Sequence, residues 1–404
     1  ALDAVGTTLA ILPAHVYDLS DPDNPDHDAA ATSQEQAQHV NENPHNQLWV
    51  GLGPYQVRSF DQQAIEAVRF DGYFDASKAG FVDEIRWRCI PSDDVAFQAV
   101  LNGELDFLDR ISSENFLGKG TAQDAFTGAY EKGFFFLGQY TYTCWNLRRP
   151  QLAVVAVREA LALAIDSAEI LQGYYKSLVR MITGPFPFDS PAYDHEVEHL
   201  PFDTERARER LEDAGWYDRN GNGIPDREGV ELELEFLVTP GNIATQALSQ
   251  KLQESLAVLG VQLRIASLDW ASLQERLRSR DFDATALAWA PPLESDPEMI
   301  WHSSGARTGA RSSNFAGLAD PEVDRLIAKG QRELEPNTRA AIWHELHARI
   351  YSLHPFLWHY NLPVKYAISK RVHGFRAYKL DPGYRIRDWF FAQGEPGIRA
   401  TLRL

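Results

Sequence analysis

The stretch VREALALAID, residues 157–166, is the most informative part of this sequence for the fold. Its apolar residues recur at helical spacing, so a helix with one apolar face is expected over residues 153–165. The preceding residues, 133–147, are rich in Phe, Tyr, Thr and Trp, which suits buried strands. The expected apolar face of the helix consists of Val154, Val157, Leu161 and Ile165.

Farther along the chain, strand patterns and helix patterns alternate. A helix over residues 203–214 is expected, because Asp203 or Thr204 can cap its start and Gly215 ends it. The rhythm of strand, helix and strand that follows is typical of a mixed sheet covered by helices. The expected strands cover residues 232–238, 261–265, 282–289, 365–368 and 375–378, and the expected helices cover residues 244–259, 270–280, 321–329 and 336–352.

Composition excludes several classes of protein. The 404 residues suggest more than one domain, and a hydrophobic fraction of 44% is enough for a large core. The formal net charge of -18 argues against a nucleic-acid binder and against attraction to anionic lipid. No apolar run approaches the ~20 residues that span a bilayer. Two cysteines, Cys89 and Cys144, are too few for a disulfide scaffold.

The sequence shows no motif that predicts an enzyme. It contains no G-x-S-x-G nucleophile motif, no G-x-G-x-x-G loop and no Walker loop. WHELH, residues 343–347, resembles a zinc motif, but its two histidines are three residues apart, whereas the H-E-x-x-H motif places them four apart on one helix face. With 57 acidic residues, chance pairs of carboxylates are certain, so such pairs nominate no catalytic dyad.

One acidic loop has the spacing of a calcium-binding loop. Oxygen-bearing side chains occupy its positions 1, 3, 5 and 9, and Gly223 occupies position 6, where a sharp turn is needed. Position 12 is Gly229 rather than a bidentate Glu, which should weaken the affinity for calcium. A turn rich in Asp and Asn is the alternative interpretation. The candidate calcium ligands are Asp218, Asn220, Asn222 and Asp226, with the carbonyl oxygen of Ile224.

Taken in order, several short motifs resemble those of the family 5 extracellular solute-binding proteins, the peptide, nickel and oligopeptide class. VREALALAID is similar to the VRQALALAID of that family and is the best single match. Each motif is weak alone, but nine in the same order across nearly the whole chain are specific, although they identify a fold rather than a ligand. The others are LPAH at 12–15, NP at 43–44 with GLGPY at 51–55, FDGYF at 70–74, LNGELD at 101–106, GP at 184–185, FD at 202–203 with AGW at 214–216, Asn314 with DPEVDRLI at 320–327, and GF at 374–375.

The resemblance implies an α/β fold of the periplasmic-binding-protein class, in which two lobes close over a ligand like a clam-shell. Lobe I would comprise residues 1–139 and 373–404, and lobe II would comprise residues 140–372. Family members carry a longer stretch before the LPAH position, so lobe I is expected to be incomplete in this chain. With lobe I incomplete, this chain is expected to bind its solute more weakly than the intact protein does. It is also expected to self-associate through the unpaired sheet edges of lobe I. The intact protein is expected to be a monomer.

The resemblance also implies a function. The chain would be the solute-binding component of a bacterial ABC importer, capturing a peptide or a related small solute and delivering it to a membrane permease. It would not be an enzyme and would need no cofactor apart from the candidate calcium. It would work in the periplasm or outside the cell, held to the membrane by a lipid if a lipobox lies upstream. The alternatives are a ligand-sensing domain of a larger regulator and a hydrolase.

Candidate solute contacts follow from the same resemblance. Peptide-binding members carry an Asp shortly after a Gly-Trp strand, but the matching place here holds Pro292 or Leu293, with Glu294 close by. A peptide with a free amino group is therefore in question, and sugars, opines, metal chelates and capped peptides remain open. The strand expected to cross between the lobes, residues 142–145, and the segment after residues 282–289 are expected to face the ligand. The candidates are the aromatic residues Tyr142, Trp145 and Trp289 and the polar residues Asp296, Arg307 and Asn314.

Overall fold

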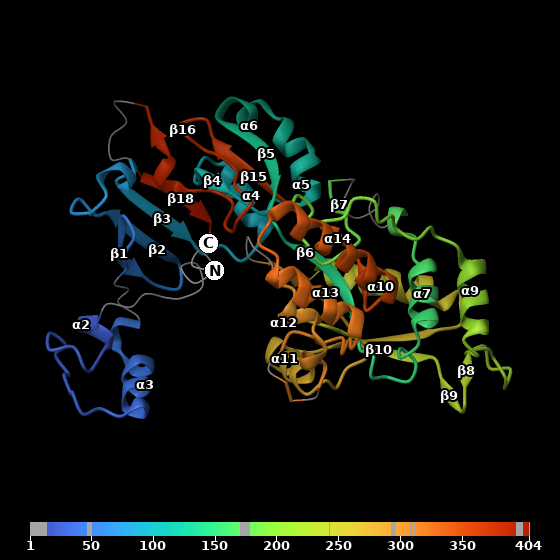
Figure 1. Cartoon of the computed structure of the whole chain (residues 1–404). Coiled ribbons are helices and arrows are strands. Elements are labelled where there is room, and N and C mark those ends of the chain that lie inside the picture. The colour runs from blue at the N-terminus through green and yellow to red at the C-terminus, as the bar shows by residue number, and fades with distance from the viewer. Residues whose placement is uncertain are drawn as a thin grey trace. The chain divides into compact units, whose positions relative to one another are not determined.

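Two sheets, each in a unit of its own, organise the chain (Figure 1). The computed structural model describes residues 14–46, 51–169, 178–241, 243–291, 296–307, 309–310, 312–392 and 399–403. Unit 1 comprises Ala1–Phe135 with Val364–Leu404, and unit 2 comprises Phe136–Pro363. These boundaries lie near those predicted for the lobes, at 139–140 and 372–373, and the assignment of lobes I and II to them stays a prediction.

Unit 1 contains a seven-stranded mixed sheet in the order β1-β2-β3-β18-β4-β15-β5. The C-terminal strand β18 runs parallel to its neighbours β3 and β4, whereas β15 runs antiparallel to β4. The last strand of the chain therefore completes a sheet begun by its first strands. The strands are β1 (Tyr55–Phe60), β2 (Ala64–Arg69), β3 (Glu84–Arg88), β4 (Phe107–Leu108), β5 (Tyr130–Phe136), β15 (Pro363–Ser369) and β18 (Arg399–Arg403), with a separate pair β16 (Val372–His373) and β17 (Phe390–Phe391).

Short helices and a cluster of packed aromatic side chains accompany this sheet. Phe107 of β4 packs against the rings of Tyr384 and Trp389, whose centroids lie 4.7 and 5.2 Å from its own. The helix α3 begins at a capping box, in which Thr32 and Glu35 satisfy each other's backbone N–H groups. The helices are α2 (Ala14–Tyr17), α3 (Ser33–Glu42), α4 (Asp93–Leu101), α5 (Ser113–Leu117) and α6 (Asp124–Ala129).

The expected strand over residues 375–378 is wrong. The chain leaves strand β16 at His373, and Gly374 has a φ of +81°, which turns it away from extended geometry. A β-carbon at position 374 would lie 2.2 Å from the carbonyl oxygen of Asp388, so only glycine fits this turn. Phe375 instead packs its ring against Phe107 and Trp389.

Unit 2 contains a five-stranded mixed sheet in the order β11-β10-β12-β6-β13. Strand β10 runs parallel to β11 and β12, and β6 runs antiparallel to both β12 and β13. The expected mixed sheet is therefore present. The strands are β6 (Tyr140–Trp145), β10 (Glu233–Val238), β11 (Gln262–Ser267), β12 (Ala284–Trp289) and β13 (Phe356–Trp358), with the small pairs β7 (Arg180–Met181) and β14 (Tyr360–Asn361), and β8 (Asp226–Arg227) and β9 (Val230–Glu231).

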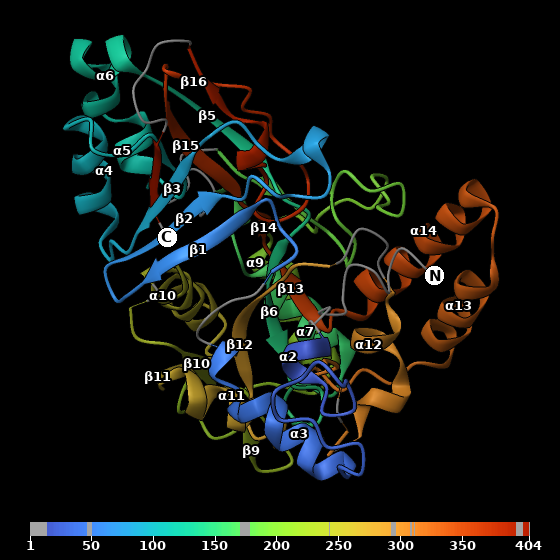
Figure 2. The ribbon, with the colours of Figure 1, turned by 90° about the vertical axis from the view of Figure 1, so that its left-hand side faces the viewer.

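Helices cover this sheet near the positions that the sequence predicts. The helix of the VREALALAID stretch, α7, packs against α9 (Figure 1), and α13 packs against α14 (Figures 1 and 2). All the expected helices of this part of the chain are confirmed to within a few residues. They are α7 (Val155–Leu163), α9 (Thr204–Asp213), α10 (Ile243–Ala257), α11 (Trp270–Arg278), α13 (Pro321–Arg332) and α14 (Pro336–Leu353). The short helix α12 (Glu298–Trp301) was not predicted.

Strand β6 separates two cores, because successive side chains of a strand point to opposite faces of the sheet. Tyr140, Tyr142 and Cys144 enter one cluster, which we call the aromatic core, and Trp145 enters the other. β6 lies between β12 and β13, so both of its edges are paired, and the two cores cover its two faces. The aromatic core also contains Ile182, Phe186, Trp301, Phe356 and Trp358, among others, and the second core contains Val157, Leu161, Leu211, Trp216 and Phe236, among others.

Candidate functional site

The carboxyl ends of the parallel strands β10, β11 and β12 mark one edge of the unit 2 sheet. In open α/β sheets, ligands bind beyond the carboxyl ends of the strands, where loops and helix starts provide varied side chains. Here the strands end at Val238, Ser267 and Trp289. We call this the carboxyl edge and take it as the candidate site.

Aromatic side chains gather at the carboxyl edge. Trp289, the last residue of β12, lies opposite Tyr140, the first residue of β6, and is half-buried against the aromatic core. Trp270 begins helix α11 just after β11, where its neighbour Asp269 caps the helix. The Trp270 side chain is 59% exposed. Flat rings at the end of a sheet suit the burial of a small solute.

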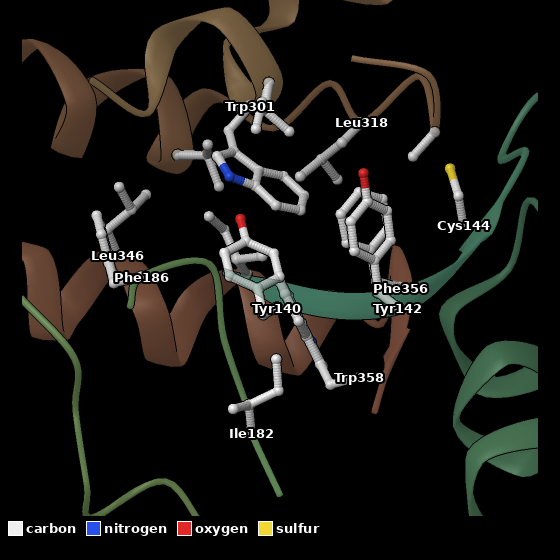
Figure 3. Close-up of a cluster of buried hydrophobic side chains, with 14 of the residues drawn as sticks. Tyr140, Tyr142, Cys144, Ile182, Phe186, Trp301, Leu318, Leu346, Phe356 and Trp358 are labelled. Atoms are coloured by element: carbon white, nitrogen blue, oxygen red, sulfur yellow. The ribbon is translucent and has the colours of Figure 1, made fainter. Parts of the chain in front are cut away.

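Two polar atoms in the aromatic core lack hydrogen-bond partners within the described part of the chain, the hydroxyl of Tyr140 and the indole N–H of Trp358. The centroids of these two rings lie 5.7 Å apart. Figure 3 shows the Tyr140 hydroxyl on the side of its ring that faces Trp301. Buried polar groups are normally paired, so these two buried atoms are exceptions to that rule in the aromatic core.

Tyr142 lies inside the aromatic core rather than at an open surface. It is 3% exposed, and its ring stacks on that of Phe356 with the centroids 3.9 Å apart and the planes 11° apart (Figure 3). Burial raises the pKa of its hydroxyl well above the ordinary value. This position argues against the predicted solute contact, because the side chain is covered by the protein itself.

Trp145 and Asn314 are also interior residues, so the structure gives each a packing role in place of the predicted solute contact. Trp145 points into the second core. The amide of Asn314 donates to the carbonyls of His302 and Leu318 and accepts from the N–H groups of Gly317 and Leu318, which fixes the loop around it.

The other predicted contacts are exposed or partly exposed. Trp289 lies at the carboxyl edge, and its contact with solute stays a prediction. Asp296 is exposed and accepts hydrogen bonds from the Glu298 N–H and the Gln331 amide. Arg307 is exposed and follows a short 3-10 turn. The structure does not bring these two residues into a common cluster with Trp289, and their role in binding stays a prediction.

Comparison with known proteins identifies the family. The profile described as "Bacterial extracellular solute-binding proteins, family 5 Middle" matches residues 5–310, which is more than half of the chain. The chain belongs to this family. The profile includes β6 and β10–β12, so the carboxyl edge of this family 5 protein lies within the matched region.

Several relatives of known name are peptide-binding proteins. The chain is 22% identical to the oligopeptide-binding protein AppA of Bacillus subtilis, over 85% of this chain and 62% of AppA. It is 23% identical to the dipeptide-binding protein of Pseudomonas aeruginosa, over 82% of this chain and 60% of that protein. The family 5 chain thus spans about three fifths of the length of these relatives.

Solved structures confirm the expected fold class. AppA of Bacillus subtilis in complex with a nonapeptide superimposes with a TM-score of 0.77 at 21% identity, covering 95% of this chain and 72% of that structure. NikZ of Campylobacter jejuni in complex with Ni(L-His) gives a TM-score of 0.71 at 19% identity, covering 87% and 70%. The prediction of an α/β two-lobe periplasmic-binding-protein fold is therefore confirmed.

Sequence reasoning did not single out Tyr140 and Trp358, the two core residues with an unpaired polar atom. Tyr140 stands two residues before Tyr142, so the alternation of a strand places both on one face, and its position at the strand start brings it to the carboxyl edge. The expected Asp place near Pro292, Leu293 and Glu294 lies outside the described residues. No part of the sequence pattern signals Trp358, because its place depends on the pairing of β13 with β6.

The acidic loop uses its oxygen atoms within the protein. Asp218 accepts hydrogen bonds from the N–H groups of Gly221, Asn222 and Gly223. Asp226 forms an ion pair with Arg219, at 3.2 Å between the carboxylate and the guanidinium. In the described parts of the chain, no cluster of three or more His, Cys, Asp or Glu side chains is arranged to hold a metal ion.

The loop also carries neighbouring groups that sequence reasoning did not include. The amide groups of Asn220 and Asn222 donate to the carboxylate of Glu231 on β9, at 3.4 and 2.7 Å. A hollow of about 520 Å³, lined among others by Arg219 and Glu233, lies beside them. Glu233 begins β10, so this hollow is at the opposite end of that strand from the carboxyl edge.

The histidines of the WHELH segment have partners other than a metal. His347 is buried, and its ring nitrogens contact the Thr183 hydroxyl and the Asp194 N–H at 3.0 and 3.1 Å. His344 contacts the carbonyl of Pro191 at 2.9 Å. Both histidines of α14 therefore hold the segment that follows β7 against this helix.

Proposed function

We propose that this family 5 protein captures a peptide or a peptide-like small solute and delivers it to the permease of an ABC importer. The observation that carries the proposal is the family match over residues 5–310, which includes the strands of the carboxyl edge. The half-buried Trp289 and the exposed Trp270 at this edge support a binding role, since rings provide apolar contact area for a small solute.

We further propose that the chain binds its solute without chemical change. The family consists of solute-binding proteins, and the motifs of the sequence include no nucleophile with a base beside it. The place of work would be outside the cytoplasmic membrane. None of the helices in the described residues is long and apolar enough to cross a bilayer.

Replacing Trp289 with alanine is expected to weaken the binding of peptide at least about tenfold, because truncation of a central aromatic contact commonly removes that much affinity. Isothermal titration with a defined mixture of tri- to pentapeptides measures the change. Phe202→Ala is the matched control, since Phe202 is an exposed aromatic residue of unit 2 that lies before α9 and away from the carboxyl edge. Equal affinities of the wild type and Trp289→Ala would contradict a role for this edge.

The acidic loop is tested separately. Asp218→Ala is expected to lower the free energy of unfolding by about 1 kcal/mol, because the turn loses side-chain acceptors for backbone N–H groups, as at a helix cap. The same loss is expected in calcium and in EDTA if the loop is only a turn. A loss confined to calcium-containing buffer, with a calorimetric signal for calcium in the wild type, would instead establish the predicted metal site.

A further inference from the structure

Two Asn-Gly peptides follow one another in the acidic loop. They are Asn220-Gly221 and Asn222-Gly223, and all four residues are exposed. Glycine has no side chain, so its backbone nitrogen can approach the side chain of the asparagine before it. Gly221 and Gly223 have φ values of +77° and +86°, and no described residue beyond their chain neighbours lies within 4 Å of where either would carry a β-carbon. There is therefore room beside both peptides for a ring to form.

One carboxylate accepts hydrogen bonds from the backbone nitrogens of both glycines. The Gly221 N–H donates to Oδ1 of Asp218 at 2.7 Å, and the Gly223 N–H donates to Oδ2 of Asp218 at 2.9 Å. A backbone nitrogen must lose its proton to become a nucleophile, and a carboxylate within hydrogen-bond reach can accept that proton as a general base. Asp218 is placed to do so for either glycine.

The side-chain amides of the two asparagines are also bonded at both ends. Oδ1 of Asn220 accepts from the Asn222 N–H, and Oδ1 of Asn222 accepts from the Ile224 N–H, each at 2.9 Å. Such donors stabilise the negative charge that a carbonyl oxygen gains when its carbon is attacked. The amide nitrogens donate to the carboxylate of Glu231 at 3.4 and 2.7 Å. The loop thus provides a base and an oxyanion donor for each Asn-Gly peptide.

We propose that Asn220 and Asn222 are sites of spontaneous deamidation through a cyclic imide, with Asp218 as the general base. The nitrogen of the following glycine forms a bond to Cγ of the asparagine, and Asp218 takes the proton of that nitrogen. The bond from Cγ to Nδ2 then breaks, and Nδ2 takes up the proton and leaves as ammonia. Water opens the imide at one of its two carbonyl groups, which gives aspartate or isoaspartate.

Deamidation would change the contacts of the acidic loop. Each event replaces an amide that donates to Glu231 by a carboxylate beside it, so the loop loses a hydrogen-bond donor and gains a negative charge. Like charges so close to one another repel. The modification is independent of solute binding, because the loop lies at the opposite end of β10 from the carboxyl edge.

A third Asn-Gly peptide, Asn102-Gly103 at the end of α4, is an internal control. Gly103 also has a positive φ, of +75°, but its N–H donates to the backbone carbonyl of Val100 at 2.9 Å. This carbonyl oxygen is a much weaker base than a carboxylate. The local sequence is the same at all three sites, so a difference in rate reports the arrangement of the acidic loop.

The test is to incubate the purified chain at pH 7.5 and 37 °C and to follow the three Asn-Gly sites by peptide mass spectrometry. Each deamidation adds about 1 Da to the peptide that contains it, and chromatography separates isoaspartate from aspartate. Asn220 and Asn222 are expected to deamidate at least about tenfold faster than Asn102, a modest effect for a positioned base. Rates at the loop that equal the rate at Asn102, or fall below it, would overturn the proposal.

The variant Asp218→Asn tests the base itself. Asparagine keeps the size of the side chain and an acceptor oxygen but takes no proton, so both loop sites are expected to slow at least about tenfold while Asn102 keeps its rate. Asp213→Asn removes an exposed carboxylate at the end of α9 and is expected to leave all three rates unchanged. Loop rates in Asp218→Asn that match or exceed those of the wild type would show that Asp218 only holds the turn, and would overturn its role as base.

Discussion

Replacing Arg158 with methionine is expected to lower the free energy of unfolding by about 3–5 kcal/mol. Arg158 lies on α7 in the VREALALAID stretch and is 2% exposed. Its guanidinium donates to the carbonyls of Leu152 and Ala153 before that helix, and to those of Leu353 and His354 at the end of α14. Methionine fills a similar volume but leaves these buried carbonyl groups without a donor.

Urea unfolding followed by tryptophan fluorescence measures this loss. The matched control is Arg325→Met, because Arg325 is exposed and pairs with Glu322 on the surface of α13. That pair is solvated, so its removal is expected to leave the unfolding midpoint unchanged. Equal midpoints for wild type and Arg158→Met would show that the guanidinium does not hold α7 to the end of α14.

Acidification is expected to destabilise the protein by several kcal/mol between pH 6.5 and pH 4. Burial lowers the pKa of His347, His354 and His199 to about 4, and that of His359 to about 3. The folded state therefore holds these rings neutral, while the unfolded chain takes up protons near pH 6.5. The stabilisation is fully present above pH 6.5 and is lost as the pH falls through 4. One such shift corresponds to about 3 kcal/mol.

His347 shows the physical reason. Its Nδ1 accepts from the Asp194 N–H, so the ring proton is on Nε2, which faces the Thr183 hydroxyl. A second proton on Nδ1 would place one N–H against another. The ring also lies tightly on Gly184, where a β-carbon would be 2.2 Å from Nε2, so it has no room to turn away.

Urea unfolding at a series of pH values between 7.5 and 4 measures the acid effect. His347→Gln is expected to be less stable than the wild type at pH 7.5, because it loses packing, but to lose less stability on acidification. His344→Gln, on the same helix and bonded to the Pro191 carbonyl, is expected to retain the full acid effect. Identical pH dependence of the wild type and His347→Gln would contradict the role given to this histidine.

The sequence predicts the elements of unit 2 well because local signals and tertiary structure agree there. Asp203 does cap α9, and its carboxylate accepts from the Arg206 N–H. The periodic apolar residues of 153–165 do lie in the second core. The strand expected over 375–378 is wrong because Gly374 turns the chain. Glycine is required there by the close carbonyl of Asp388, and a local sequence pattern around residue 374 does not include that residue.

The candidate site is harder to predict than the fold. Sequence reasoning selected Tyr142 and Trp145 because they lie on an aromatic strand, yet a core covers each face of β6, so both residues are buried. Trp289 lies at the carboxyl edge because it ends its strand. The difference between a buried ring and an available ring depends on strand order, which a single sequence does not specify.

The most direct test of the account is equilibrium dialysis of the purified chain against a defined mixture of tri- to pentapeptides, with mass spectrometry of the bound and free fractions. The account predicts that a subset of peptides is retained by the protein and returns with unchanged masses after the protein is denatured. Retention of no peptide at all, or the return of cleaved peptides, would contradict the claim that this chain captures a solute and leaves it intact.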